Sequence, residues 1–174
     1  MENQVSFEEV KQAFLETDRR MRETDRKLAE VSRQIGGLGN RLGEFVAGIV
    51  RPGLVRLFRD KGVDVHQTLR DLEAKRDGVS AQIDLLVVNA DHAVAVEVKS
   101  KLSVSDVDEH LDRLEKFKFL FPQYAQTRLH AAVAAMVIPE ASARYAERLG
   151  MFVIGQAGDD AVFFNSEGFE PRAW

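Results

Sequence analysis

Three charged residues, Asp84, Glu97 and Lys99, lie within two mostly apolar segments of the chain. The segments, at 82–89 and 92–99, are rich in β-branched side chains and are separated by a short polar turn, as in a β-hairpin. A tight turn between them places Asp84 directly opposite Glu97, with Cβ atoms about 5 Å apart. Side chains alternate along a strand, so Glu97 and Lys99 share a face of the sheet. Because like charges this close repel each other, the pattern indicates a site for a divalent cation.

The residue types in this cluster suit metal-assisted hydrolysis of a phosphate ester. A hard cation such as Mg²⁺, or Mn²⁺ in its place, prefers oxygen ligands and keeps several waters for its substrate. We expect Asp84 and Glu97 to bind the metal, with the carbonyl oxygen of Val98 as a further ligand. The metal would polarise a phosphoryl oxygen and activate a water near neutral pH. Lys99 would orient or deprotonate that water, or stabilise the developing negative charge.

The rest of the chain predicts an α/β fold, a mixed sheet with helices on both faces. Before the hairpin we expect a helix at 41–61, kinked or restarted at Pro52, a strand at 63–69, and a polar connection ending in Asp77-Gly78. After the hairpin we expect a helix capped by Ser105 with Asp108 and ended by Pro122, a strand at 129–138, a helix at 140–149, and strands at 151–155 and 161–164.

Both faces of the hairpin are apolar, as in a sheet that is covered on both sides. One predicted face carries Ile83, Leu85, Val87, Val94, Val96 and Val98. The other carries Leu86, Val88, Ala93 and Ala95, followed at the open end by Asp84, Glu97 and Lys99. The charges are therefore confined to one corner of the sheet, and that corner is the candidate site.

A seven-residue repeat precedes this domain and predicts a coiled-coil helix over 1–39, with the folded domain over 40–174. Its two apolar sets are Phe7, Phe14, Met21, Leu28, Ile35 and Leu42, and Val10, Thr17, Thr24, Val31, Leu38 and Phe45. We expect it to assemble a homodimer or higher homo-oligomer; the alternative is a helix that folds back on its own domain. Glycines at 36, 37, 39 and 43 predict a break or hinge where the coil ends.

Composition narrows the class of protein further. The chain has 174 residues, a net charge of −4 and no cysteine, so disulfides and thiolate metal sites are excluded. The net charge is not that of a strongly basic nucleic-acid-binding protein. No apolar run approaches the length of a membrane span, and the first residues lack a signal peptide's basic and apolar stretches. We therefore expect a cytoplasmic protein that does not bind membranes.

The order Asp84, twelve residues, then Glu97-Val98-Lys99, on a hairpin within these elements, resembles the PD-(D/E)xK nuclease superfamily. The resemblance covers about residues 41–156 and implies a restriction-endonuclease-like αβββαβ core. It implies that Asp84 and Glu97 bind Mg²⁺ and that Lys99 assists the attacking water in phosphodiester hydrolysis. By the same resemblance Glu44, on the first core helix, would complete the metal site. The chain departs from the family pattern in having Ile83 where proline precedes the aspartate.

Three functions remain open on this evidence. The first is a metal-dependent nuclease acting on DNA, in which the coiled coil pairs two sites. The second is a catalytically inactive nuclease-like fold that serves as a coiled-coil assembly or DNA-docking module. The third is a plain scaffold, in which Glu97 and Lys99 form a structural ion pair. The basic residues after the motif, Lys101, Arg113, Lys116 and Lys118, could contact phosphates; the alternative, which we expect, is a solvated helix face.

Overall fold

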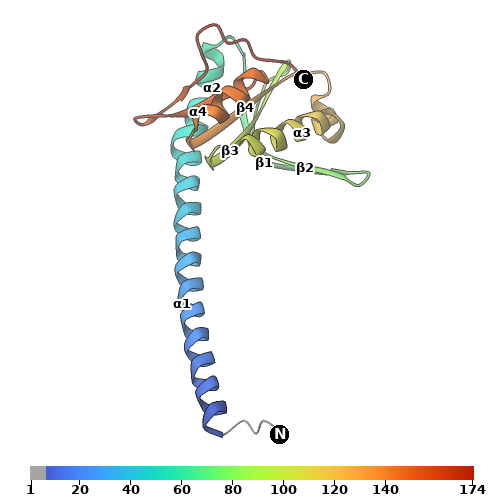
Figure 1. The fold of residues 1–174 in the computed structure, drawn as a ribbon. Coiled ribbons are helices and arrows are strands. Elements are labelled where there is room, and N and C mark those ends of the chain that lie inside the picture. The colour runs from blue at the N-terminus through green and yellow to red at the C-terminus, as the bar shows by residue number, and fades with distance from the viewer. Residues whose placement is uncertain (1–6) are drawn as a thin grey trace. The chain divides into compact units, whose positions relative to one another are not determined.

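The computed structural model describes residues 7–174, so the first six residues of the predicted coiled-coil segment lie outside the described part. Contacts divide the chain into two units between Arg41 and Leu42, two residues after the boundary expected from the sequence. The first unit contains a long helix, and the second contains a six-stranded sheet with its covering helices (Figure 1).

Helix α1 is continuous from Phe7 to Phe45. The break predicted at the glycines is therefore wrong, because the helix passes through all four of them. A Cβ atom at Gly36, Gly37, Gly39 or Gly43 would meet no atom within 4 Å. Each glycine costs helix stability of roughly 1 kcal/mol relative to alanine, and the rest of α1 outweighs that cost. Exposed pairs one turn apart support the helix, among them Glu16–Arg20 at 2.6 Å and Glu23–Lys27 at 2.7 Å.

The helical path continues past α1 through a π-helical segment, Val46–Val50, into α2, Arg51–Asp60. Pro52 lies in the first turn of α2, the part of a helix that tolerates proline best. The wider π-helical turn precedes the proline and separates the two α-helical stretches. Pro52 thus marks the restart that the sequence predicted. On its inner face α2 buries Leu54 and Phe58.

The sheet has the spatial order β1-β2-β3-β4-β5-β6. The first three strands, β1 (Gln67–Arg76), β2 (Val79–Val88) and β3 (His92–Lys101), form an antiparallel meander. The strands β4 (Arg128–Val137) and β5 (Phe152–Ala157) run parallel to β3, and β6 (Asp160–Phe163) returns antiparallel at the edge. Helix α3 (Val104–Leu120) connects β3 to β4, and α4 (Glu140–Arg148) connects β4 to β5. The domain is therefore α/β with a mixed sheet, as predicted.

The predicted strand at 63–69 is placed wrongly, because β1 begins at Gln67 and continues to Arg76. The segment expected to be a polar connection is thus most of an edge strand, and Asp77-Gly78 forms a hairpin turn with positive φ at both residues. Only residues 85–88 of β2 pair with β3. The far end of the β1–β2 hairpin therefore extends beyond the other strands (Figure 1).

Helices cover both faces of the sheet, as the two apolar faces of the hairpin predicted. The face that includes Leu86, Val88, Ala93 and Ala95 packs against buried side chains of α3 and α4. The opposite face, which includes Leu85, Val87, Val94 and Val96, packs against α2 and the end of α1. Burial on both faces explains why these strands carry almost uninterrupted apolar runs.

Helix α3 begins two residues earlier than the sequence predicted. Its N-cap is Ser103 rather than Ser105, and Asp106 rather than Asp108 completes the capping box. The Ser103 hydroxyl accepts the Asp106 amide at 3.2 Å, and the Asp106 carboxylate accepts the Ser103 amide at 2.8 Å. Two overlapping Ser-x-x-Asp sequences occur here, and the earlier one starts the helix.

Among residues 7–174, no helix combines the length and the apolar character that crossing a membrane requires.

Candidate functional site

The candidate site lies where β2 and β3 diverge. Their pairing follows the predicted register, Leu85 with Val96 and Val88 with Ala93, and ends at Leu85. At the next residue the side chain of Asp84, rather than the backbone, bonds to β3. The Val98 N–H donates to Asp84 Oδ2 at 2.8 Å. The carboxylate of Asp84 is thus fixed at the fork between the two strands.

One predicted side-chain orientation is wrong at this fork. Ile83 was expected on the face of Leu85 and Val87, yet it is buried with Leu86 on the α3 face. The alternation of β2 is therefore lost between Ile83 and Leu85. On the neighbouring strand Asp71 adopts a positive φ of 48° and does not pair with Asp84. This local distortion separates Asp84 from the regular ladder and leaves its carboxylate free to bond the Val98 amide.

Glu97 is the most buried charged side chain of the site, with 3% of its surface exposed. Both of its carboxylate oxygens have cationic partners. Lys99 Nζ is 3.0 Å from Oε1, and Arg113 Nη1 is 2.6 Å from Oε2. A buried carboxylate is stable only when such partners compensate its lost hydration. Strand β3 supplies Glu97 and Lys99, while α3 supplies Arg113 from above the same face.

Lys99 links Glu97 to the start of α3. Its ammonium group is 3.4 Å from Asp106 Oδ1, so the carboxylate of the capping box also belongs to the charged network. Partial burial alone would lower the pKa of Lys99, but its bonds to Glu97 and Asp106 outweigh burial and raise that pKa. Lys99 is therefore a cation at neutral pH. In this arrangement it can donate to an anion or to a water, but it cannot remove a proton.

Asp84 lies in a less favourable environment for a charge. Burial raises the pKa of its carboxyl group, and the nearby Glu97 carboxylate raises it further. The Val98 hydrogen bond and the positive charges of Lys99 and Arg113 offset only part of this effect. Two acids in one corner with an incompletely compensated charge form an arrangement that a divalent cation would stabilise.

His110 of α3 is fully buried beside the same carboxylate. Its Nε2 lies 3.2 Å from the carbonyl oxygen of Ala95, which can only accept, so Nε2 carries the proton. Its Nδ1 lies 3.9 Å from Glu97 Oε2 and has no hydrogen-bond partner in the described part of the chain. Burial lowers the pKa of His110 to about 4, so the ring is neutral at pH 7.

The sequence analysis missed both residues that α3 adds to the site. Arg113 was expected on a solvated face, but only 25% of its side chain is exposed because it pairs with Glu97. His110 was not assigned to the buried face of α3. A signal was present, since Val107, His110, Leu114 and Phe117 follow the helical spacing of a single face. The buried face was predicted from apolar residues alone, so the histidine at the same spacing was left out of it.

The expected third acid does not join the cluster. Glu44 is exposed near the end of α1, and residues 7–174 contain no group of three His, Asp or Glu side chains spaced to hold a metal. The backbone of Val98 contributes its amide to Asp84; its carbonyl remains a predicted ligand. The acids brought together are therefore Asp84 and Glu97, with Lys99, Arg113 and His110 around them.

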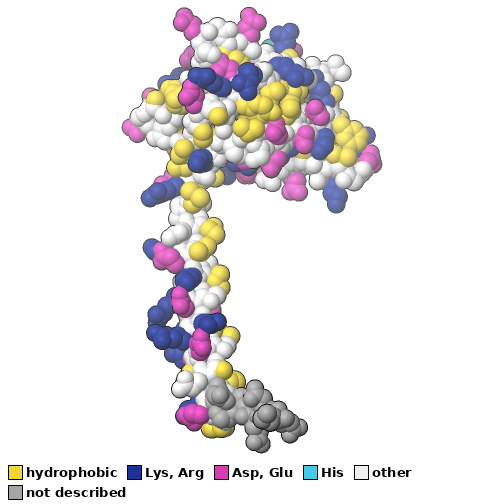
Figure 2. All heavy atoms as spheres, viewed as in Figure 1, with side chains coloured by type: hydrophobic (Ala, Val, Ile, Leu, Met, Phe, Trp, Pro, Cys, Tyr) yellow, Lys and Arg dark blue, Asp and Glu magenta, His cyan; other side chains and the backbone are white. Residues whose placement is uncertain are grey.

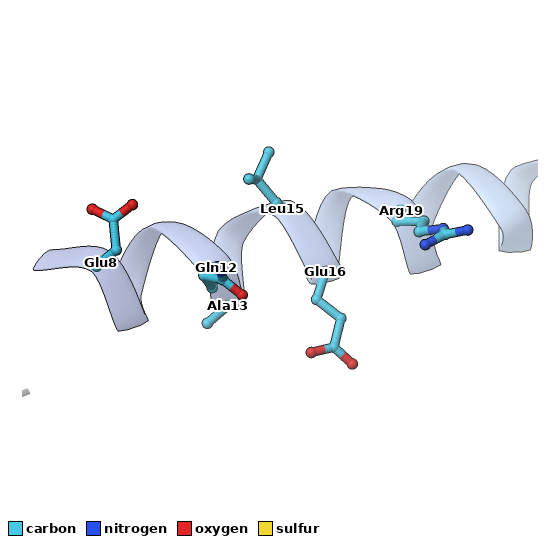
Figure 3. Close-up of a pocket in the computed structure, with 6 residues that line it drawn as sticks. All are labelled: Glu8, Gln12, Ala13, Leu15, Glu16 and Arg19. Carbon is cyan, nitrogen blue, oxygen red and sulfur yellow. The ribbon is translucent and has the colours of Figure 1, made fainter. Parts of the chain in front are cut away.

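Two surface hollows formed by described residues lack the converging charged side chains of this corner. One is lined by Glu8, Gln12, Ala13, Leu15, Glu16 and Arg19, all from α1 (Figure 3). Their side chains project from one helix in several directions and do not converge on a point. Another hollow follows α2 at Arg56 and Arg59. There Arg56 pairs with Asp160 at 3.0 Å and Arg59 lies 4.0 Å from Asp64, so neither arginine is available as an uncompensated charge.

Comparison with known proteins does not assign a function to the chain. No family model matches the chain, and no curated protein matches it. A solved structure of a protein of unknown function, AF1548, is similar over 59% of this chain and 54% of its own, with 15% sequence identity and a TM-score of 0.40. The chain thus spans about half the length of that protein. A likeness this distant supports no conclusion about activity.

Proposed function

We propose that the protein is a metal-dependent nuclease of the PD-(D/E)xK type that hydrolyses DNA phosphodiester bonds at the corner formed by Asp84, Glu97 and Lys99. The observation that carries the proposal is the buried Glu97 carboxylate, held beside a second acid at the fork of two strands. A scaffold has no need to bury a carboxylate there, since an apolar residue would be as stable or more stable.

The arrangement of elements supports the same proposal. The order helix, three antiparallel strands, helix and a fourth strand parallel to the third matches the core expected for a restriction-endonuclease-like fold. The acids lie on the second and third of these strands, as the resemblance requires. Helix α3 then covers the face of the sheet that carries Glu97.

The two acids suit Mg²⁺ or Mn²⁺ in chemistry and in number. Asp84 and Glu97 supply oxygen ligands, and Mg²⁺ sites on substrate phosphates commonly use one or two protein carboxylates and several waters. A bound cation would supply Lewis-acid activation of the phosphate and of a water. Glu44 is not required for this minimum, although the resemblance assigns it a role.

The chain's own residues would divide the remaining tasks. The Val98 amide orients the Asp84 carboxylate, and Arg113 orients that of Glu97. Lys99 remains protonated, so its role is to donate to a phosphate oxygen or to hold the attacking water, and to stabilise the charge that develops. Proton removal by Lys99, which the sequence left open, is disfavoured by its raised pKa.

Cleavage of plasmid and linear DNA with Mg²⁺ or Mn²⁺ tests the proposal. Wild-type protein should cut, and Asp84→Asn and Lys99→Met should each lose at least a hundredfold in rate, since each removes a group at the reacting phosphate. Asp91→Asn is a matched control, because Asp91 is an exposed acid in the turn of the same hairpin. Equal cutting by wild type and Asp84→Asn would refute the assignment.

One observation favours the inactive alternative, a nuclease-like fold used for assembly or DNA docking. Both oxygens of Glu97 already have cationic partners, so this carboxylate is compensated without a metal. If this is the function, the protein neither cuts DNA nor binds Mn²⁺ at millimolar concentration, and it shifts DNA in a gel equally with and without metal. Both functions predict that Asp84→Asn still binds DNA. Metal binding is therefore the measurement that separates them.

A further inference from the structure

Helix α1 exposes a continuous apolar stripe that no other described residue covers. The α1 stripe comprises Phe7, Val10, Phe14, Thr17, Met21, Thr24, Leu28, Val31, Ile35 and Leu38. Its large apolar members are between 48% (Val10) and 83% (Phe7) exposed. Figure 2 shows apolar side chains following one side of this helix, with charged ones on the other. The next heptad positions, Leu42 and Phe45, pack into the core of the folded domain, so the stripe ends at Leu38.

The stripe has the geometry of a coiled-coil surface. Its members occur at alternating spacings of three and four residues over nearly five heptads, which is the pattern that buries a helix face against another helix. Over residues 7–38 the surface is about 48 Å long at 1.5 Å per residue. The two threonines do not oppose burial strongly. The Thr17 hydroxyl bonds the Ala13 carbonyl at 2.8 Å, and the Thr24 hydroxyl bonds that of Arg20 at 2.9 Å.

The charges that flank the stripe favour one orientation of a second copy. In a parallel, in-register pair, Arg20 meets the partner's Asp25, and the same contact forms a second time by symmetry. In an antiparallel pair that keeps the stripe fully overlapped, Arg20 meets the partner's Lys27. In that pair Asp18 also meets the partner's Asp25. All antiparallel flanking contacts between charges are therefore repulsive, whereas the parallel contacts between charges are attractive.

We propose that the α1 stripe binds a second copy of this chain, in parallel and in register. The partner is another copy because the flanking charges of α1 complement those of α1 itself. The interaction is independent of the proposed nuclease chemistry, since no residue of the stripe belongs to the candidate site. Its consequence is that two folded domains are tethered through the same ends of their helices.

Single cysteines test the orientation, and the native chain has none to confuse the result. Val10→Cys and Leu38→Cys each place identical positions side by side in the parallel pair, within the Cα separation that a disulfide tolerates. Both variants should form disulfide-linked dimers under mild oxidation. In the antiparallel pair, residue 10 faces residue 35, and the two copies of residue 10 are roughly 37 Å apart. Mixed disulfides between Val10→Cys and Ile35→Cys chains would overturn the parallel assignment.

Mass in solution tests the surface itself. The full-length chain, of 19.5 kDa, should show a multiple of that mass by light scattering. Leu28→Glu, on the stripe, should weaken association at least tenfold. Leu15→Glu is the matched control, because Leu15 is as exposed as Leu28 (62% against 59%) and lies on α1 outside the stripe. It should change association less than twofold.

Three outcomes of the mass measurements overturn the proposal. Wild-type protein that remains at 19.5 kDa up to millimolar concentration would show that the stripe has no copy as partner, and that α1 packs on its own domain or on another protein. Equal loss of association in Leu15→Glu and Leu28→Glu would place the contact elsewhere on α1. Association that persists in Leu28→Glu would place it outside α1.

Discussion

Helix α1 and the acidic corner of the domain treat charge and apolar surface in opposite ways. In α1 the ion pairs are exposed, as at Glu16–Arg20, and large apolar side chains are exposed with them. In the corner the apolar residues are buried, and a charged side chain, Glu97, is buried among them. The helix thus leaves apolar surface exposed to water, whereas the corner holds a carboxylate away from water between Lys99 and Arg113. Each region therefore carries a free-energy cost. In α1 the cost is apolar surface in water, and in the corner it is a charged side chain away from water.

The largest expected effect is a loss of stability when the buried ion pairs of the corner are broken, compared with an exposed ion pair of α1. Glu97→Gln leaves the positive charges of Lys99 and Arg113 without their shared counter-ion in a mostly buried place. The free energy of unfolding should fall by about 3 kcal/mol. Glu16→Gln breaks an exposed pair of equally short distance in α1 and should cost at most about 0.5 kcal/mol. Urea denaturation measures both. Equal losses would show that burial of the corner has no energetic consequence.

Acid should destabilise the domain through His110. The folded-state pKa of His110 is lowered to about 4 from an ordinary 6.5, so between these values the unfolded chain binds a proton that the folded one does not. The free energy of unfolding should therefore be highest above pH 6.5 and should fall as the pH is lowered. The decrease should be about 2 kcal/mol at pH 5. Urea denaturation at pH 7 and pH 5 measures the loss.

The variants His110→Leu and His66→Gln isolate this effect. In His110→Leu the loss between pH 7 and pH 5 should shrink, although part remains because burial also lowers the pKa of His130. His66 is exposed, so His66→Gln should keep the full wild-type loss. An unchanged pH dependence in His110→Leu would contradict the account of the buried ring.

Glycines should respond in opposite directions in the two regions. Gly37 lies within α1 with open space around it, so Gly37→Ala should stabilise the helix by about 1 kcal/mol. Gly155 of β5 packs against the ring of Phe164, and a Cβ there would overlap that ring. Gly155→Ala should therefore lower stability by at least about 1 kcal/mol. Thermal unfolding followed by circular dichroism measures both shifts. Destabilisation by Gly37→Ala would restore the hinge that the sequence suggested.

The sequence predicted the hairpin register correctly because apolar alternation and a short turn together leave little freedom. It failed at β1, where the side chains are mostly polar. An edge strand can be polar because only Leu69, Leu72 and Ala74 need to pack, and its hydrogen bonds come from β2. It also failed at the glycines of α1, since propensity is weak beside the support of the surrounding helix.

The candidate site was predicted in part, for a reason of the same kind. Asp84, Glu97 and Lys99 were found because their positions along two paired strands follow from local periodicity. Arg113 and His110 come from α3, and their distances to Glu97 depend on how the helix crosses the sheet. Helix register against a sheet is a tertiary property, so residue types alone did not reveal that Lys99 and Arg113 share Glu97, with the neutral ring of His110 beside it.

Asp84 provides the most direct test of the corner as a cation site. Burial and Glu97 raise the pKa of Asp84. The free energy of unfolding therefore falls as the pH rises through that raised value, and the ionised Asp84 destabilises the folded protein at neutral pH. Asp84→Asn removes this cost and can still accept the Val98 amide. The metal-free variant should therefore be as stable as the wild type or slightly more stable, and loss of metal binding could not be attributed to unfolding.

Calorimetric titration with Mn²⁺ of wild type, Asp84→Asn and the control Asp91→Asn is the decisive measurement. Wild type and Asp91→Asn should bind Mn²⁺ alike, and Asp84→Asn should bind at least tenfold more weakly. Identical isotherms for wild type and Asp84→Asn, or no binding by the wild type at millimolar Mn²⁺, would contradict a cation site at this corner.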